Sequence, residues 1–165
     1  MAVLASAVTV SGRFARSANL ERDAARAEPL DGYVLTAKGI EVLDRIAATA
    51  AEGPSGGAWS LTGPYGSGKS SLGLLLDAAF SGDSPLRRRA EQLIGEASPS
   101  TGDMLRRAHG RHGTSRRGFN RGIVTATREP LARTVARALQ CAVRRTDPPP
   151  RRLMHPVLAG SFSTL

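Results

Sequence analysis

The chain has 165 residues and a formal net charge of +9, and Cys141 is its only cysteine. This length suits one domain with a hydrophobic core. A single cysteine excludes a disulfide framework and a cysteine metal site, and no apolar run approaches the roughly 20 residues that span a bilayer. We therefore expect a cytoplasmic protein with no membrane partner.

The positive charge is concentrated in the second half of the chain. Residues 1–86 carry seven Lys or Arg and nine Asp or Glu, whereas residues 87–165 carry sixteen Arg and five acids. The two parts therefore have net charges of −2 and +11. Such asymmetry is typical of proteins that contact nucleic-acid phosphates. The arginine bias of a GC-rich genome produces it as well, so a nucleic-acid partner for the Arg-rich half stays an alternative.

The first predicted elements belong to a lead segment, residues 1–57. A polar stretch over residues 16–23 precedes a short extended piece over residues 30–35. Thr36 is a suitable N-cap for a helix that ends near Ala51, and the glycine- and proline-rich residues 53–57 follow it. Three- and four-residue spacing of apolar side chains predicts that one face of this helix is buried. These positions are Ile40, Leu43, Ile46, Ala47 and Ala50.

Residues 58–80 are typical of a strand, a glycine-rich loop and a helix in succession. The β-prone residues 58–62 run into residues 63–70, which match G-x-x-x-x-G-K-[ST], and an apolar helix covers residues 71–80. Glycines let backbone amides turn toward a phosphate, and a helix that begins at about Gly68 points its positive end at the same anion. The motif therefore predicts a nucleotide-binding loop.

Two side chains of this loop have specific chemical roles. Lys69 would reach the β- and γ-phosphates, and the Ser70 hydroxyl would coordinate the Mg²⁺ that bridges them. The expected cofactors are ATP and Mg²⁺. The candidate nucleotide-binding residues are Gly63, Pro64, Tyr65, Gly66, Ser67, Gly68, Lys69, Ser70 and Ser71, and Ser70 is the candidate metal ligand.

The rest of the chain continues the alternation of helices and strands. We expect short helices over residues 85–94 and 102–108, an exposed basic loop over 109–118, a strand over 122–127 and a long helix over 130–145. The Pro- and Arg-rich residues 146–165 show no periodicity and are expected to be disordered. We thus divide the chain into the lead segment with its helix, 1–57, a core, 58–145, and a tail, 146–165.

The alternation predicts an α/β fold, with a partial parallel sheet flanked by helices as in P-loop NTPases. Only two or three convincing strands are present, fewer than the about five of an average sheet. We therefore expect an incomplete domain.

Hydrolysis of a nucleotide requires an acidic residue at the end of a second strand, and no strand of this sequence ends in one. Glu129 lies nearest to that position but is better explained as a first-turn acid of the next helix. Asp77 is expected on a helix surface and Trp59 in the core. His109 and His112 are expected in a solvated loop, because Gly110 and Gly113 interrupt any helix that would align them as metal ligands.

Residues 16–71 resemble, as a unit, the N-terminal ATP-binding region of large bacterial AAA-like ATPases, several of which lie in phage-defence gene clusters. The resemblance rests on residues 16–23, 32–36, the following helix and 58–70, about a third of the chain, and residues 118–138 extend it. It implies an ATP-binding role for residues 63–70. The family's downstream Mg²⁺-binding acidic motif is absent, which puts hydrolysis by this chain alone in doubt.

The leading prediction is an ATP-binding P-loop module that forms the N-terminal part of a larger ATPase or acts with partner subunits or as an oligomer. Whether it is an enzyme stays open, since hydrolysis needs the missing acidic motif or a partner that supplies it. One alternative is a small phosphotransferase of the metabolite-kinase type, which would need a carboxylate to activate its acceptor. The other is a nucleic-acid-binding protein.

Overall fold

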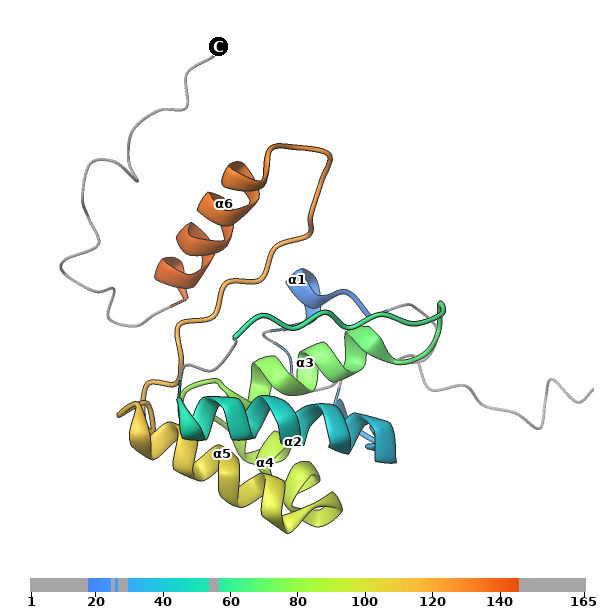
Figure 1. The fold of residues 1–165 in the computed structure, drawn as a ribbon, viewed down its shortest axis with the longest axis vertical. Helices are drawn as coiled ribbons and strands as arrows, with labels where there is room; N and C mark the ends of the chain where they lie inside the picture. The colour runs from blue at the N-terminus through green and yellow to red at the C-terminus, as the bar shows by residue number, and fades with distance from the viewer. Residues whose placement is uncertain (1–17, 25, 27–29, 54–56, 146–165) are drawn as a thin grey trace, which may run out of the picture.

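A computed structural model describes residues 18–24, 26, 30–53 and 57–145. The described residues form helices, which are connected by turns and extended segments (Figure 1). The helices are α1 (Leu20–Asp23), α2 (Ala37–Glu52), α3 (Lys69–Ala79), α4 (Pro85–Ala97), α5 (Pro99–Arg111) and α6 (Leu131–Arg144). The expected helices after residues 36, 70, 85 and 130 are confirmed, and the one expected over 102–108 is longer.

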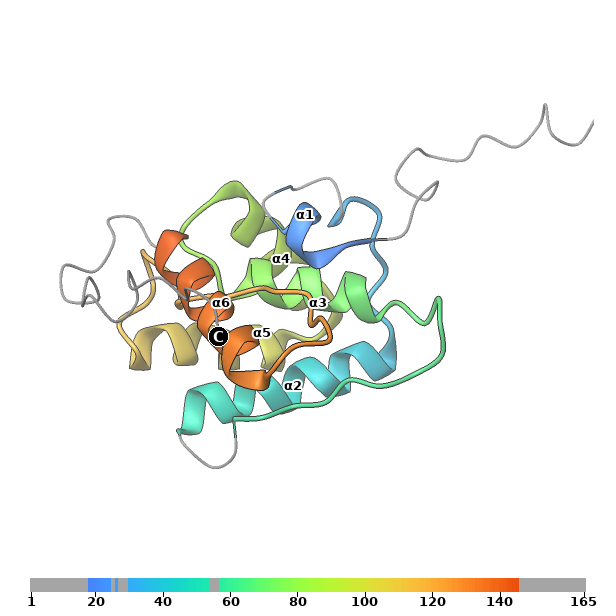
Figure 2. The same ribbon diagram turned by 90° about the horizontal axis from the view of Figure 1, so that it is seen from above.

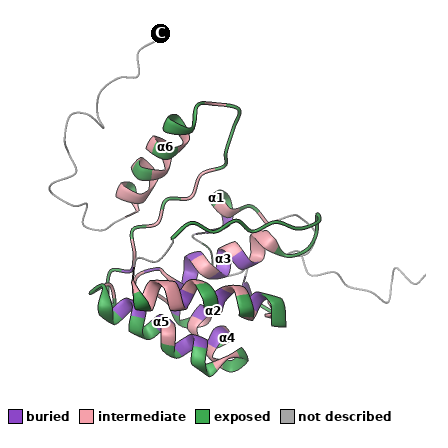
Figure 3. Ribbon diagram, viewed as in Figure 1, coloured by how far each residue is buried: buried purple, intermediate pink, exposed green. Residues whose placement is uncertain are grey.

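The hydrophobic core lies among α2, α3, α4 and α5, whose buried faces meet (Figure 3). Leu43 on α2, Leu75 on α3, Ile94 on α4 and Leu105 on α5 are each at most 2% exposed. Alanines fill the space between these larger side chains, as Ala47 does on α2. Small residues let the helix axes approach closely, so a chain poor in aromatic residues can still build a dense core.

Hydroxyl side chains mark where three core helices begin. Thr36, Ser84 and Ser98 each accept a hydrogen bond from the backbone N–H three residues later. Pro85 and Pro99 occupy the first helical positions of α4 and α5, where a missing N–H costs no helical hydrogen bond. The boundaries of these helices are therefore fixed locally, by residues that the sequence displays.

Helices α2 and α5 lie side by side and run in the same direction. Thr101, near the start of α5, donates from Oγ1 to Asp44 Oδ1 at 2.9 Å. At the other end, Arg111 Nη1 donates to Glu52 O at 2.7 Å and to Ala51 O at 3.1 Å. Since these carbonyls end α2, the guanidinium caps that helix and places a cation at its negative end.

The expected parallel sheet is absent from the part of the chain that the structure describes, so the α/β prediction is wrong there. The two expected strands, residues 58–62 and 122–127, are extended segments (Figure 1), but neither pairs with another segment, so neither is a strand. Figure 2 shows residues 57–68 as a single extended segment that runs alongside α2. A β-prone sequence becomes a strand only when a neighbour satisfies its backbone N–H and C=O groups. Within the described chain no second extended segment does so.

Helix α6 stands apart from the core and contains no buried residue (Figure 1). The apolar face expected for it forms, but it is largely in solvent, with Leu131 77%, Val135 47% and Leu139 54% exposed. Polar contacts anchor the helix: Arg137 donates to Thr125 O at 3.0 Å, and Arg145, just after it, reaches Asp77 on α3. In the residues described, no helix has the length and apolar character needed to cross a membrane.

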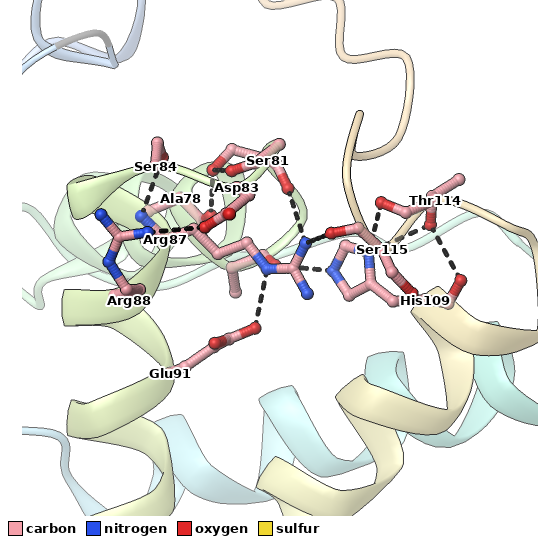
Figure 4. Close-up of polar contacts among 12 residues, drawn as sticks. Ala78, Ser81, Asp83, Ser84, Arg87, Arg88, Glu91, His109, Thr114 and Ser115 are labelled. Carbon is pink, nitrogen blue, oxygen red and sulfur yellow. Dashed lines mark hydrogen bonds and ion pairs between the residues drawn. The ribbon is translucent and has the colours of Figure 1, made fainter.

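A polar clasp joins the turn 81–83 to the loop 115–118 (Figure 4). Asp83 N donates to Arg116 O at 2.8 Å, and Arg87 Nη1 on α4 donates to Ser115 O at 2.7 Å. Gly118 lies against the turn so closely that a Cβ there would collide with Ser81 and Gly82 backbone atoms. The clasp therefore fixes how the chain leaves the helical core toward residues 120–128.

Candidate phosphate-binding loop

Two glycines with positive φ shape the backbone of the glycine-rich loop. Gly66 and Gly68 have φ values of 80° and 82°, in the left-handed region that residues with a Cβ avoid. Gly68 is the N-cap of α3, which confirms the expected start of the helix. Residues 63–68 are all exposed to solvent. The loop is thus an open turn over the N-terminus of α3.

Lys69 folds back across this loop. Its Nζ donates to Gly63 O at 2.9 Å, to Pro64 O at 2.6 Å and to Ser67 Oγ at 3.2 Å. These three contacts hold the ammonium group against the loop although the side chain itself belongs to the first turn of α3. The loop therefore carries a full positive charge beside the helix terminus.

The N-terminus of α3 adds to this positive potential. Its N-cap Gly68 offers no side-chain oxygen to the first amides, whereas a hydroxyl serves that purpose in α2, α4 and α5. Uncapped amides at a helix start carry a partial positive charge equivalent to roughly half a unit. Together with Lys69, they favour an anion at this place.

Ser70 borders two cavities. One, of about 400 Å³, lies between α2, α3 and the extended segment 57–61, and Lys69 lines it as well. The other, of about 480 Å³, lies between the start of α1 and residues 122–125. No carboxylate lines either cavity, and the described residues contain no cluster of three His, Cys, Asp or Glu. A Mg²⁺ held by Ser70 would therefore take its other ligands from phosphate oxygens and water.

The two acids considered from the sequence are engaged elsewhere. Glu129 Oε1 accepts from Arg137 Nη2 at 2.7 Å and from Thr134 Oγ1 at 2.9 Å, and the Arg137 hydrogen bond is the main reason why its pKa is lowered. Asp77 is buried, so its expected place on a helix surface is wrong, and it pairs with Arg121 and Arg145. Both carboxylates join segments of the chain to one another.

Two further residues differ from their expected surroundings. Trp59, expected in the core, is 45% exposed and lines the cavity next to Lys69. His109, expected in a solvated loop, is 1% exposed near the end of α5, where it stacks edge-on with Phe119. Its Nε2 hydrogen-bonds to Ala79 O at 2.9 Å and its Nδ1 to Thr114 Oγ1 at 3.0 Å. Nothing in the local sequence signals that burial.

Glu21 connects α1 to the extended segment that borders the second cavity. Its Oε1 accepts from Thr125 N at 2.7 Å and its Oε2 from Thr125 Oγ1 at 2.9 Å. The backbone hydrogen bond from Thr125 is the main cause of a Glu21 pKa below the ordinary 4.5. A lowered pKa in the folded state means that this contact stabilises the protein fully above pH 4.5 and is lost as the pH falls through the lowered value.

We therefore expect the Thr125 amide resonance to be constant near neutral pH and to shift in a single step below pH 4.5. A pH titration followed by NMR measures this step. Glu21→Gln keeps the shape of the side chain but removes its charge change, so the step at Thr125 should disappear. An unchanged step in the variant would assign it to another carboxylate, such as Glu129.

Comparison with known proteins places this site in no family. The chain matches no family model, no curated protein and no solved structure.

Proposed function

We propose that residues 63–70 bind the phosphates of ATP together with Mg²⁺, and that the chain is an ATP-binding module of a larger ATPase or of an assembly with partner subunits. The observation that carries the proposal is the position of Lys69 Nζ, which contacts Gly63 O, Pro64 O and Ser67 Oγ at the N-terminus of α3. A phosphate chain that enters the loop replaces neutral carbonyl acceptors with charged oxygens, which bind an ammonium group more strongly.

Binding without autonomous turnover is the activity that the side chains favour. Hydrolysis or phosphoryl transfer needs a base or a water-orienting residue near the γ-phosphate. Of the described residues, no Asp or Glu lines the cavities beside Ser70, and Glu129 and Asp77 are held by arginines. A partner that supplies the acid would complete such a site.

Exposed parts of the chain support an assembly. The backbone groups of residues 57–62, next to the loop, have no backbone partner among the described residues. Leu131, Val135 and Leu139 form an apolar stripe along α6. Unpaired extended backbone and a contiguous apolar face are both features that proteins cover with other chains. Covering the segment 57–62 would also enclose the phosphate loop that follows it.

Titration of the purified chain with Mg·ATP, followed by calorimetry, tests the proposal. We expect saturable binding, and at least tenfold weaker binding for Lys69→Ala, because a hydrogen bond between charged groups contributes about 1.5–3 kcal/mol. Lys38→Ala is the matched control: Lys38, the only other lysine, is exposed on α2 and pairs with Glu41. It removes the same charge and should leave binding unchanged.

Two results would overturn the proposal. One is a folded wild-type chain, verified by circular dichroism, that shows no saturable binding of Mg·ATP. The other is binding by Lys69→Ala with the wild-type affinity, which would place the nucleotide somewhere other than residues 63–70.

A further inference from the structure

The cavity between α2, α3 and residues 57–61 has the character of a site for a flat organic group. Its volume of about 400 Å³ falls within the range of about 300–1,000 Å³ that is usual for small-molecule sites. Val42 and Ile46 of α2, Leu61 of the extended segment and Leu76 of α3 supply apolar walls. Leu20 of α1 also lines it, so the cavity is a mostly apolar pocket bounded by four segments of the chain.

One aromatic side chain, Trp59, belongs to the lining of this pocket. Trp59 is 45% exposed, and the Arg45 guanidinium lies over one face of its ring, 5.1 Å from the ring centroid. A half-exposed tryptophan retains ring surface on which a flat π-system can stack. Stacking of a nucleobase on an aromatic side chain is a general mode of nucleotide recognition, since every base has a π-face.

The same cavity reaches the phosphate loop. Lys69 and Ser70 belong to its lining, so its apolar walls and the candidate phosphate ligands form one continuous surface. A ligand that fits it has a polyanionic end and a flat, weakly polar end. A nucleoside triphosphate has this composition, whereas a peptide or an acyl chain lacks the polyanion.

The polar side chains that line the cavity determine which nucleobase can form hydrogen bonds there. Guanine presents two adjacent N–H donors that a carboxylate matches, and no Asp or Glu lines the cavity. Ser60 also lines the cavity, and its hydroxyl can accept a hydrogen bond from the amino group of adenine. We infer that this pocket binds the adenine base of the nucleotide, with Trp59 as its stacking platform; this inference rests on the proposed function and adds the base-binding site to it.

Comparison of Mg·ATP with Mg·tripolyphosphate separates the base site from the phosphate site. If adenine stacks on Trp59, wild-type protein should bind Mg·ATP about five- to tenfold more tightly than Mg·tripolyphosphate, and more tightly than Mg·GTP. Trp59→Leu should abolish the preference for ATP while leaving the affinity for tripolyphosphate unchanged. Leu131→Ala, an exposed apolar residue of α6 outside the cavity, serves as the control and should keep the preference.

The wild-type chain supplies a second readout that needs no variant. Trp59 is the only tryptophan, so its fluorescence reports on this pocket alone. ATP should change the emission strongly and tripolyphosphate only weakly. Equal affinities for ATP and tripolyphosphate, equal fluorescence responses, or a preference that persists in Trp59→Leu would each overturn the base site but leave phosphate binding intact. Failure of the folded chain to bind either compound would overturn both.

Discussion

Replacement of Gly118 by alanine is expected to lower the free energy of unfolding by about 3–5 kcal/mol, because backbone strain and overpacking act together. Gly118 has a φ of 74°, which disfavours any residue with a Cβ. The new methyl group would also point into the turn 81–83, where Ser81 O would be only 2.6 Å away. Because these neighbours are backbone atoms, the clash can be relieved only by opening the clasp.

Gly113 offers a matched control in the same region of the chain. Its φ is 62°, but a Cβ there would meet no atom within 4 Å. Gly113→Ala should therefore cost only the backbone strain, about 1–2 kcal/mol. Urea unfolding followed by circular dichroism gives both free energies. Equal losses in the two variants would mean that the contact with the turn 81–83 contributes nothing.

Local signals in the sequence predicted the helices well, because the determinants of a helix lie within it and at its ends. Thr36 and Ser84 cap helices at the expected positions, and the apolar spacing around Leu43 places that residue in the core. The turn before α3 was predictable for the same reason. Its glycines define the turn, and α3 begins at Lys69, next to the expected Gly68.

The prediction of a parallel sheet was wrong because a strand depends on a partner distant in sequence, which local signals do not show. Residues 58–62 have the composition of a strand, yet their backbone groups find no neighbour among the described residues. The 45% exposure of Trp59 agrees with this, since no described segment pairs with the one that carries it. The prediction that Trp59 is buried came from its residue type and requires a second layer of structure over it.

The burial of two polar side chains, Asp77 and His109, was not predicted, for a related reason. Asp77 and His109 were expected at the surface, and the residues beside them in sequence reveal no partner. Their partners are distant: Arg121 lies 44 residues from Asp77, and Ala79 O lies 30 residues from His109. Burial of a polar side chain costs free energy unless it has a hydrogen-bonding partner, and the tertiary fold decides whether a partner lies next to it.

Asp77 on α3 forms ion pairs with Arg121 and Arg145, which lie in the second half of the chain. Removal of the carboxylate and removal of an arginine should have different effects on stability, because the three side chains differ in burial. The Asp77 side chain is 5% exposed, whereas Arg121 and Arg145 are 22% and 24% exposed. Arg121 Nη1 lies 2.6 Å from Asp77 Oδ2 and donates to Asp77 O at 2.8 Å, while Arg145 is farther, at 3.4 Å from Oδ1. Loss of Arg121 therefore leaves the buried Asp77 carboxylate with only the more distant Arg145 as a cationic partner.

We therefore expect Arg121→Ala to lower the free energy of unfolding by about 3 kcal/mol, and Asp77→Ala to lower it less, because a long arginine side chain can turn its charge to water. The double variant Asp77→Ala/Arg121→Ala should be more stable than Arg121→Ala alone, since it removes the stranded charge. Arg117→Ala, an exposed arginine without an ion pair in the described structure, should change stability by less than about 0.5 kcal/mol. A double variant less stable than Arg121→Ala would show instead that the carboxylate stabilises the fold without its partner. In that case Asp77 and Arg145 would be the pair that holds α6 to α3.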